Sequence, residues 1–332
     1  MKLKVLFIGG TGIISSACSK LAIERNAELY LLRRGVSTRD VPEGAITLNG
    51  DIRDPESAKA AIGDRKFDVV VNWIGFTPEH IAADIALFTG RTKQYVFISS
   101  ASAYQTPPDS LPVTESCVLD NPYWAYSRNK IACEELLVKT FQESRFPITI
   151  VRPSHTYDQT LLPMDGGYTV IDRMRRGKKV IVHGDGTSLW TITNHRDFAK
   201  GFVGLLGNRL AIGESFHITT DESYTWNKIF EIYADAAGAK ADIVHVPSEL
   251  IAAYDENWGA GLLGDKAHSM VFDNAKIKRL VPAFKATVPL HQGAKETLAW
   301  YDADPARQVV DEQTNELIDR ILNAYKKAWP KK

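Results

Sequence analysis

The sequence contains few cysteines and carries no net charge, and each shortage excludes a class of protein. Its 332 residues include only Cys18, Cys117 and Cys133, with no CxxC spacing. This odd, scattered set argues against a disulfide framework and against thiolate metal sites, so we expect a reduced, cytoplasmic protein. The 40 basic residues balance the 40 acidic ones, giving a formal charge of +0. Without a broad positive field, neither nucleic acid nor an anionic membrane is an expected partner.

Long apolar runs and metal-binding motifs are missing as well. No apolar run approaches the roughly 20 residues that span a bilayer. The apolar stretch before Gly9 is too short for the core of a signal peptide, and we interpret it as a first strand. The eight histidines show no HExxH or similar spacing, so no metal site is predicted.

Short apolar runs alternate with helix-length segments through the first half of the chain. The runs that predict strands are residues 3–8, 28–32, 45–48, 68–72, 94–98 and 148–151. Continuous apolar runs suit strands that are buried on both faces, and strand–helix alternation predicts right-handed crossovers. We therefore expect an α/β fold, a Rossmann-type doubly wound parallel sheet with a smaller C-terminal substrate-binding lobe.

Glycine and proline punctuation becomes denser after Pro153, where the regular alternation ends. This change predicts a dinucleotide-binding domain over residues 1–158, with return segments around 180–220. Residues 159–180 and 221–332 then form the substrate-binding lobe.

A glycine-rich turn follows the first predicted strand and leads into a helical pattern. Gly9 permits a tight turn, and Gly12 lets the backbone approach a pyrophosphate. The N–H groups and positive dipole of the following helix would bind that anion, which places Thr11 and Ile13 beside it. Ser15 occupies the usual position of a third glycine, where a small residue is tolerable. The turn predicts a dinucleotide cofactor.

Arg33 and Arg34 end the second predicted strand, where an acidic residue would bind the ribose hydroxyls of NAD. Two guanidinium groups suit a 2′-phosphate, so NADP is favoured over NAD. The alternative is that these arginines stack on the adenine or face solvent. Asp51 and Ile52, after the third strand, are placed to meet the adenine.

Two YxxxK pairs occur, and their contexts differ. Tyr126 and Lys130 open a helical pattern shortly after the strand that leads into Ser100, at the sheet edge where ligands bind. Tyr224 and Lys228 lie in the second lobe, and we interpret Tyr224 as structural. Residues four apart share a helix face, so the ammonium of Lys130 can lie beside the phenol of Tyr126.

A proton-transfer role for Tyr126 follows from this placement. The Lys130 charge and a cationic nicotinamide would lower the pKa of the Tyr126 phenol and let it act as acid or base near neutral pH. Ser100 would hydrogen-bond the same substrate oxygen, while the cofactor exchanges a hydride with the substrate carbon.

Seven segments carry a wider resemblance: GGTGIIS from Gly9, GDIRD from Gly50, NWIG from Asn72, FISSASAY from Phe97, YSRNK from Tyr126, VRPSHTYD from Val151 and HGDGTSLW from His183. Through them the chain resembles the extended short-chain dehydrogenase/reductase superfamily, in its NAD-dependent epimerase/dehydratase group. The resemblance implies Ser100, Tyr126 and Lys130 as the catalytic triad. It also implies that Trp73, Gly75, Ser99 and Pro153 lie beside the cofactor.

The sequence departs from this family where substrate is bound. Trp190 stands where nucleotide-sugar epimerases carry an arginine for the substrate diphosphate, and Leu263 stands at a second arginine position. Lys266, His268, Arg173, Arg175 or Arg176 are possible substitutes, although the last three suit a solvated helix end better.

Three residues are candidate substrate contacts: Ser102, His155 and Trp190. Trp190 would stack on a sugar or base, or else belongs to the core. His155 would serve the substrate, or else is a structural histidine. Sugar 4,6-dehydratases carry an Asp-Glu pair where this chain has Ala101 and Ser102, so elimination would need another acid or base such as Glu79, His80, His155 or Asp158.

We expect an NAD(P)-dependent sugar or nucleotide-sugar epimerase or oxidoreductase. Alternatives are a dehydratase of the same family and a non-catalytic nucleic-acid-binding protein resembling chloroplast stem-loop-binding proteins. The superfamily also implies a possible homodimer through the helix that begins near Tyr126 and its neighbour after Glu79.

Overall fold

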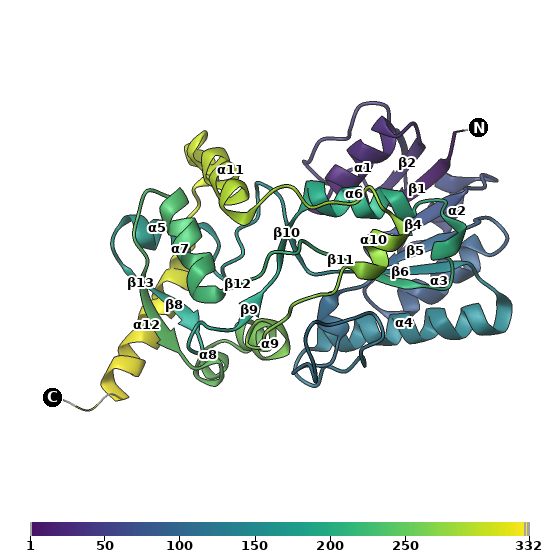
Figure 1. The fold of residues 1–332 in the computed structure, drawn as a ribbon. Coiled ribbons are helices and arrows are strands. Elements are labelled where there is room, and N and C mark those ends of the chain that lie inside the picture. The colour runs from purple at the N-terminus through teal and green to yellow at the C-terminus, as the bar shows by residue number, and fades with distance from the viewer. Residues whose placement is uncertain (1, 329, 331–332) are drawn as a thin grey trace.

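The computed structural model describes residues 2–328 and residue 330, and it has two lobes (Figure 1). The first lobe is built on a seven-stranded sheet in which every pair of neighbouring strands is parallel. In spatial order, the strands are β11 (Ser215–Ile218), β6 (Ile148–Pro153), β5 (Tyr95–Ile98), β4 (Val69–Asn72), β1 (Lys4–Ile8), β2 (Glu28–Arg33) and β3 (Ile46–Asn49). The six strands expected in the first half, and the doubly wound α/β fold, are confirmed.

Two apolar layers hold helices against the faces of this sheet. One layer joins it to α1 (Ser15–Glu24), α6 (His195–Leu205) and α10 (Ala275–Leu280). The other joins it to α2 (Pro55–Ile62), α3 (Pro78–Phe88) and α4 (Ala125–Ser144). Strands β4 and β5 are buried at every position, as expected for strands covered on both faces.

The second lobe has its own core and two small sheets (Figure 1). Parallel strands β8 (Lys179–His183) and β13 (Asp242–Val246) form one sheet, and antiparallel β9 (Leu189–Trp190) and β12 (Tyr224–Thr225) form the other. The helices of this lobe are α5 (Tyr168–Arg175), α7 (Trp226–Ala236), α8 (Ser248–Tyr254), α9 (Glu256–Gly261), α11 (Leu290–Asp302) and α12 (Glu312–Ala328). Short helical turns are η1 (Ala101–Ala103), η2 (Arg209–Ala211), η3 (Leu262–Lys266) and η4 (Pro305–Arg307), of which η3 is a π-helix.

The chain passes between the lobes several times, and α6 and β11 fall within the range 180–220 where a return to the first lobe is expected. Strand β8 pairs with β13 in the second lobe, because its apolar residues pack there, whereas α6 and β11 return to the large sheet. Strands β7 (His155–Tyr157) and β10 (Ile192–Asn194) form a further two-stranded sheet, which is parallel. A later segment also returns, since Ile277, Val281 and Phe284 pack against the first lobe's core.

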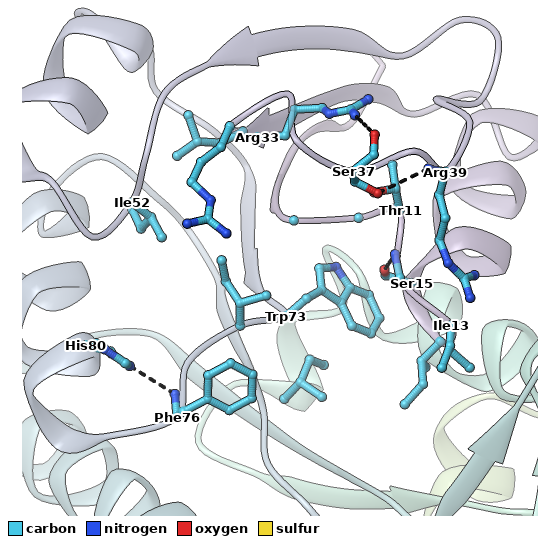
Figure 2. Close-up of a pocket in the computed structure, with 18 of the residues that line it drawn as sticks. Thr11, Ile13, Ser15, Arg33, Ser37, Arg39, Ile52, Trp73, Phe76 and His80 are labelled. Atoms are coloured by element: carbon cyan, nitrogen blue, oxygen red, sulfur yellow. Dashed lines mark hydrogen bonds between the residues drawn. The ribbon is translucent and has the colours of Figure 1, made fainter. Parts of the chain in front are cut away.

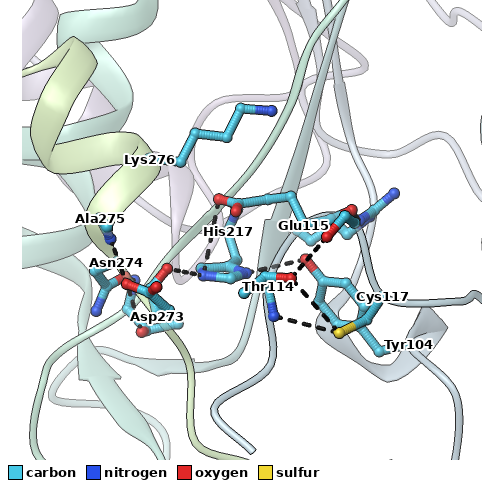
Figure 3. Close-up of polar contacts among 12 residues, drawn as sticks. Tyr104, Thr114, Glu115, Cys117, His217, Asp273, Asn274, Ala275 and Lys276 are labelled. Carbon is cyan, nitrogen blue, oxygen red and sulfur yellow. Dashed lines mark hydrogen bonds and ion pairs between the residues drawn. The ribbon is translucent and has the colours of Figure 1, made fainter. Parts of the chain in front are cut away.

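His217, on β11, anchors a buried polar network beside the outer strands (Figure 3). The carbonyl oxygen of Asp273 lies 2.8 Å from Nε2 of this histidine, and the Tyr104 hydroxyl lies 3.0 Å from Nδ1. Because a carbonyl only accepts, Nε2 carries the proton and Nδ1 accepts from the tyrosine. Burial lowers the pKa of His217, and the nearby Glu115 opposes that shift.

Arg152, on β6, continues this network. Its guanidinium donates to both carboxylate oxygens of Glu134, on α4, at 2.6–3.2 Å, and to the Glu115 carbonyl at 3.2 Å. The guanidinium also lies 4.8 Å from the centre of the Tyr104 ring. We call Tyr104, Glu115, Glu134, Arg152 and His217 the edge polar network. It fixes the loop after β5, which carries Ser100, against the sheet.

None of the helices within the described residues is both long and apolar enough to cross a membrane. The same part of the chain brings together no three His, Cys, Asp or Glu side chains in an arrangement that could hold a metal ion.

Candidate active site

The turn between β1 and α1 needs glycine for both conformation and space. Gly9 and Gly10 have φ values of 95° and 107°, in the region that favours glycine. A Cβ on Gly10 would lie 2.7 Å from a methyl carbon of Leu31 on β2. The amide of Gly12 donates to Ser15 Oγ at 2.8 Å, so Ser15 braces the turn where a third glycine was expected. The turn therefore brings the start of α1 close to the sheet.

This turn forms one wall of a cavity of about 890 Å³ at the carboxyl edge of the large sheet (Figure 2). That volume lies within the range of about 300–1,000 Å³ that is usual for ligand sites. The cavity brings together the predicted residues Gly9, Thr11, Gly12, Ile13, Arg33, Arg34, Asp51, Ile52, Trp73, Ser99, Ser100, Tyr126, Lys130 and Pro153. Gly75 does not line it, but its carbonyl accepts a hydrogen bond from Lys130.

Arg33 and Arg34 face the cavity from the end of β2. Arg33 donates to the Ser37 carbonyl at 3.1 Å, and its Nε is buried without a partner. Arg34 lies 3.8 Å from the carboxylate of Asp51 and is largely exposed. Both guanidinium groups thus retain donors for a ligand.

Arg39 also lines the cavity, and the sequence analysis missed it. Its guanidinium donates to Asp158 at 2.6 Å and to Thr160 Oγ1 at 2.5 Å, both just after β7. Figure 2 shows Arg39 among the residues that line the cavity. This ion pair fastens the loop after β2 across the cavity. Asp158, which the sequence offered as an acid or base, is held in that bridge and its pKa is below its ordinary value, since the bonds from Arg39 and Thr160 outweigh its burial.

Lys130 is almost fully buried on α4 beneath Tyr126. Its Nζ donates to the carbonyl oxygens of Gly75 at 2.6 Å and Ile98 at 2.8 Å. These two bonds leave one ammonium proton for a further acceptor. Burial lowers the pKa of Lys130 to about 8.

Tyr126 lies one helical turn before Lys130, and the ammonium lies 5.7 Å from the centre of its ring. Burial raises the pKa of the phenol, a hydrogen bond with Ser100 lowers it, and the charge of Asp265 raises it. The net shift is upward. The expectation that Lys130 and a bound nicotinamide together lower this pKa stays a prediction, since it includes the charge of the cofactor.

Ser100 belongs to a chain of three hydroxyl groups. Ser102 Oγ lies 2.8 Å from Ser100 Oγ and accepts a hydrogen bond from Ser127 Oγ at 2.8 Å. Ser102 is buried, so it orients Ser100 from behind instead of facing an open site.

The other candidate substrate contacts are not among the residues that line the cavity, although Ser154 and Thr156, on either side of His155, are. Trp190 is 2% exposed and packs against Trp226 in the core of the second lobe, so it offers no free stacking face. His155 is partly exposed, but its Nε2 is buried without a partner. Burial and the positive charge of Lys266 lower the pKa of His155 to about 3. Tyr224 pairs with Trp190 in a small sheet and does not line the cavity.

The chain matches the family model described as "NAD dependent epimerase/dehydratase family" over residues 5–219. It is 25% identical over 257 residues to a chloroplast stem-loop binding protein of 41 kDa from Arabidopsis thaliana, a match that covers 73% of this chain and 65% of that relative's length. The chain therefore spans somewhat less than two thirds of that relative.

Solved structures share the fold. A dTDP-glucose 4,6-dehydratase from Bacillus anthracis, in complex with NAD, is 17% identical with a TM-score of 0.73, covering 92% of this chain and 98% of that one. A UDP-glucose 4-epimerase from Bifidobacterium longum, in complex with NAD⁺ and UDP, is 19% identical with a TM-score of 0.72, covering 91% and 99%.

Proposed function

The chain belongs to the NAD dependent epimerase/dehydratase family, and from that premise we propose that it oxidises a carbinol carbon of a sugar or nucleotide sugar by hydride transfer. One observation carries the proposal: Ser100, Tyr126 and Lys130 line the same cavity as the glycine turn. The glycine turn, whose backbone would bind an anion, and Tyr126, which would transfer a proton, therefore face one site at the carboxyl edge of the sheet.

A dinucleotide fits the residues of this cavity. The turn over Gly9–Gly12 and the start of α1 would hold its pyrophosphate, and the free proton of Lys130 would bond the nicotinamide ribose. Arg33, with a buried unpartnered Nε, and Arg34 would hold a 2′-phosphate, so NADP is preferred to NAD. When bound, the nicotinamide ring accepts and returns the hydride.

Tyr126 takes the proton of the substrate hydroxyl as the carbon is oxidised. Burial raises the pKa of this phenol, and the positive charge of a bound oxidised nicotinamide would counter that effect, so that the phenol would release its own proton to solvent before it takes that of the substrate. Ser100, oriented by Ser102, bonds the same substrate oxygen. Return of the hydride to the opposite face gives an epimerase, and release of the ketone gives a dehydrogenase.

The test is single-turnover absorbance of the nicotinamide under anaerobic conditions, with UDP-glucose and dTDP-glucose as probes and NAD⁺ or NADP⁺ as cofactor. Tyr126→Phe should slow hydride transfer by about 10²–10⁴-fold, because it removes the proton-transfer group. Tyr224→Phe, in the other YxxxK pair, is the matched control and should leave the rate unchanged. Absence of hydride transfer with both probes, or an active Tyr126→Phe, would overturn the proposal.

The stem-loop-binding name of the Arabidopsis relative is the observation that favours an RNA-binding alternative. The neutral charge balance opposes it, since phosphate contacts dominate RNA affinity. Salt-dependent binding of an RNA hairpin that Tyr126→Phe leaves unchanged, together with absent hydride transfer, would favour that alternative.

A further inference from the structure

The loop that follows β2 is held in place mainly by its side chains. Residues 34–38 are exposed and belong to no helix or strand. Within the described part of the chain, residues 34–40 make no backbone–backbone hydrogen bond. We call residues 34–39 the strap. A segment with so few bonds of its own opens at a low free-energy cost unless a side chain fastens it.

The turn that receives Arg39, the last residue of the strap, is fixed by bonds of its own. Oδ1 of Asp158 accepts from the Thr160 amide at 2.8 Å and from Thr160 Oγ1 at 2.6 Å. The Thr160 carbonyl accepts from the Tyr301 hydroxyl at 3.0 Å, which ties the turn to α11 in the second lobe. The Asp158 side chain is only 5% exposed. We call Asp158 and Thr160 the catch, because they are rigid where the strap is loosely held.

Arg39 fastens the strap to the catch with two hydrogen bonds. Its Nη1 donates to Oδ2 of Asp158 at 2.6 Å, and its Nη2 donates to Thr160 Oγ1 at 2.5 Å. Among the described residues, no other hydrogen bond or ion pair joins the strap to the segment after β6. Since one partner is buried and the bond carries charge, this contact is stronger than an ordinary surface pair.

The closed strap spans the cavity that would hold the dinucleotide. In the large sheet, β1, β4 and β5 lie between β2, which leads to the strap, and β6, which leads to the catch. Four strand spacings of about 4.8 Å separate the two strands by about 19 Å. Most of the strap lines the cavity, and Figure 2 shows its residues Ser37 and Arg39. Three residues on the way to the catch also line it: Pro153, Ser154 and Thr156.

Resting on the proposed function, which calls for the cofactor, we propose that the Arg39–Asp158 pair is a latch that holds the strap across the bound dinucleotide and sets the rate of cofactor exchange. The pair breaks when the cofactor enters or leaves and forms again afterwards. Neither residue of the catch lines the cavity, so the catch acts through the strap and not through a bond to the cofactor. Such a latch slows binding and release alike and changes the Kd much less, because it favours neither the free nor the bound state.

The experiment follows the fluorescence of NADPH, and separately of NADH, by stopped flow without any sugar. Mixing with the protein gives the association rate, and displacement by excess NADP⁺ or NAD⁺ gives the dissociation rate. Asp158→Asn keeps the size of the side chain but removes the charge that holds Arg39. Both rates should rise by about 10–100-fold, the factor expected when a hydrogen bond to a charged group is lost.

Further variants test whether the two residues act as one device. Arg39→Met should raise both rates as Asp158→Asn does, and the double variant should be no faster than either single variant. Thr160→Val leaves the Asp158 charge in place and should raise both rates by a smaller factor, which keeps the test available if Asp158→Asn does not fold. Arg175→Met is the matched control, because Arg175 is similarly exposed and pairs with Asp302 away from the cavity. It should leave both rates unchanged.

The outcomes separate this inference from the proposed function. Exchange rates that stay unchanged in Asp158→Asn and Arg39→Met would overturn the latch alone. Faster release with unchanged association, seen in Arg39→Met but not in Asp158→Asn, would also overturn it, because Arg39 would then be a direct ligand of the cofactor. A protein that binds neither dinucleotide would overturn the proposed function, and the latch with it.

Discussion

His155, Asp165, Asp265 and Lys266 interact electrostatically with one another, and we call them the inter-lobe group. The edge polar network and the inter-lobe group are both clusters of charged and polar side chains, yet they differ in how completely those side chains are bonded. In the edge polar network, both ring nitrogens of His217 have partners and Arg152 makes a bidentate pair with Glu134. In the inter-lobe group, the Nε2 of His155 is unpartnered. Burial lowers the pKa of both histidines, so their titration does not distinguish them.

The difference in bonding predicts how much each group of polar side chains contributes to the stability of the fold. Once a donor and an acceptor are both buried and paired, removing one leaves the other without water or partner, and the fold loses stability. A group that is already unpartnered makes no such bond, so its removal costs the fold little. We infer that the edge polar network stabilises the fold and that the inter-lobe group contributes less to its stability.

Breaking the buried pair in the edge polar network should have the largest effect. Arg152→Met leaves the Glu134 carboxylate buried without its counter-charge, and we expect the free energy of unfolding to fall by about 3–5 kcal/mol. Urea denaturation measures this change. The control is Arg175→Met, which removes a partly exposed pair with Asp302 and should cost only about 0.2–1 kcal/mol. If the two variants lost equal amounts of stability, the buried pair would stabilise the fold no more than the exposed pair, contrary to our inference.

A smaller loss is expected where one neutral hydrogen bond is removed from the same network. Tyr104→Phe leaves Nδ1 of His217 buried without its donor, which should cost about 1–3 kcal/mol. Tyr123→Phe, at a tyrosine that is 45% exposed, serves as the comparison and should change stability by less than about 0.5 kcal/mol. If Tyr104→Phe unfolded at the same urea concentration as the unmodified protein, the network would not be a stabilising one.

The smallest change in the free energy of unfolding should be a gain in stability, and it should come from a substitution of Asp265 in the inter-lobe group. The pKa of Asp265 is about 7, above its ordinary value of 3.8, so between these values the folded protein binds a proton that the unfolded chain has released. The contribution of this carboxyl to stability is therefore present below about pH 4 and is lost as the pH rises through 7.

Asp265→Asn should accordingly unfold at a slightly higher temperature than the unmodified protein at pH 8. We expect a gain on the order of 1 kcal/mol, which allows for solvent screening of a partly exposed group, or about 2 °C in Tm. Thermal unfolding followed at pH 8 and pH 4 checks this, and the gain should vanish at the lower pH. Destabilisation at pH 8 would show that Asp265 belongs with the structural groups.

Much of the fold and of the cofactor cavity could be predicted because their signals are local. Apolar runs such as residues 68–72 predict buried strands, and the glycine turn needs its residue types at fixed spacing. The carboxyl ends of parallel strands share one edge, so the residues after each strand meet in one cavity.

Other parts depend on contacts between distant segments, which no local pattern reveals. Arg39 lies in an irregular loop, and its partner Asp158 is set only by how that loop crosses the cavity. The η3 turn lies beside the loop before α4 because the Gly264 carbonyl accepts a hydrogen bond from Asn121, far away in the sequence. The alternatives for Trp190 could not be separated by sequence, since a tryptophan suits a core and a stacking site equally.

The late return of the chain to the first lobe has a consequence for how the protein is made. Ile277 and Phe284 cover the same face of the large sheet as α1 and α6, although they follow most of the second lobe in sequence. During synthesis, that face therefore stays partly uncovered until the ribosome has released these residues. A chain cut after residue 219, where the family match ends, would retain every strand of the large sheet but expose part of its core to water and to aggregation.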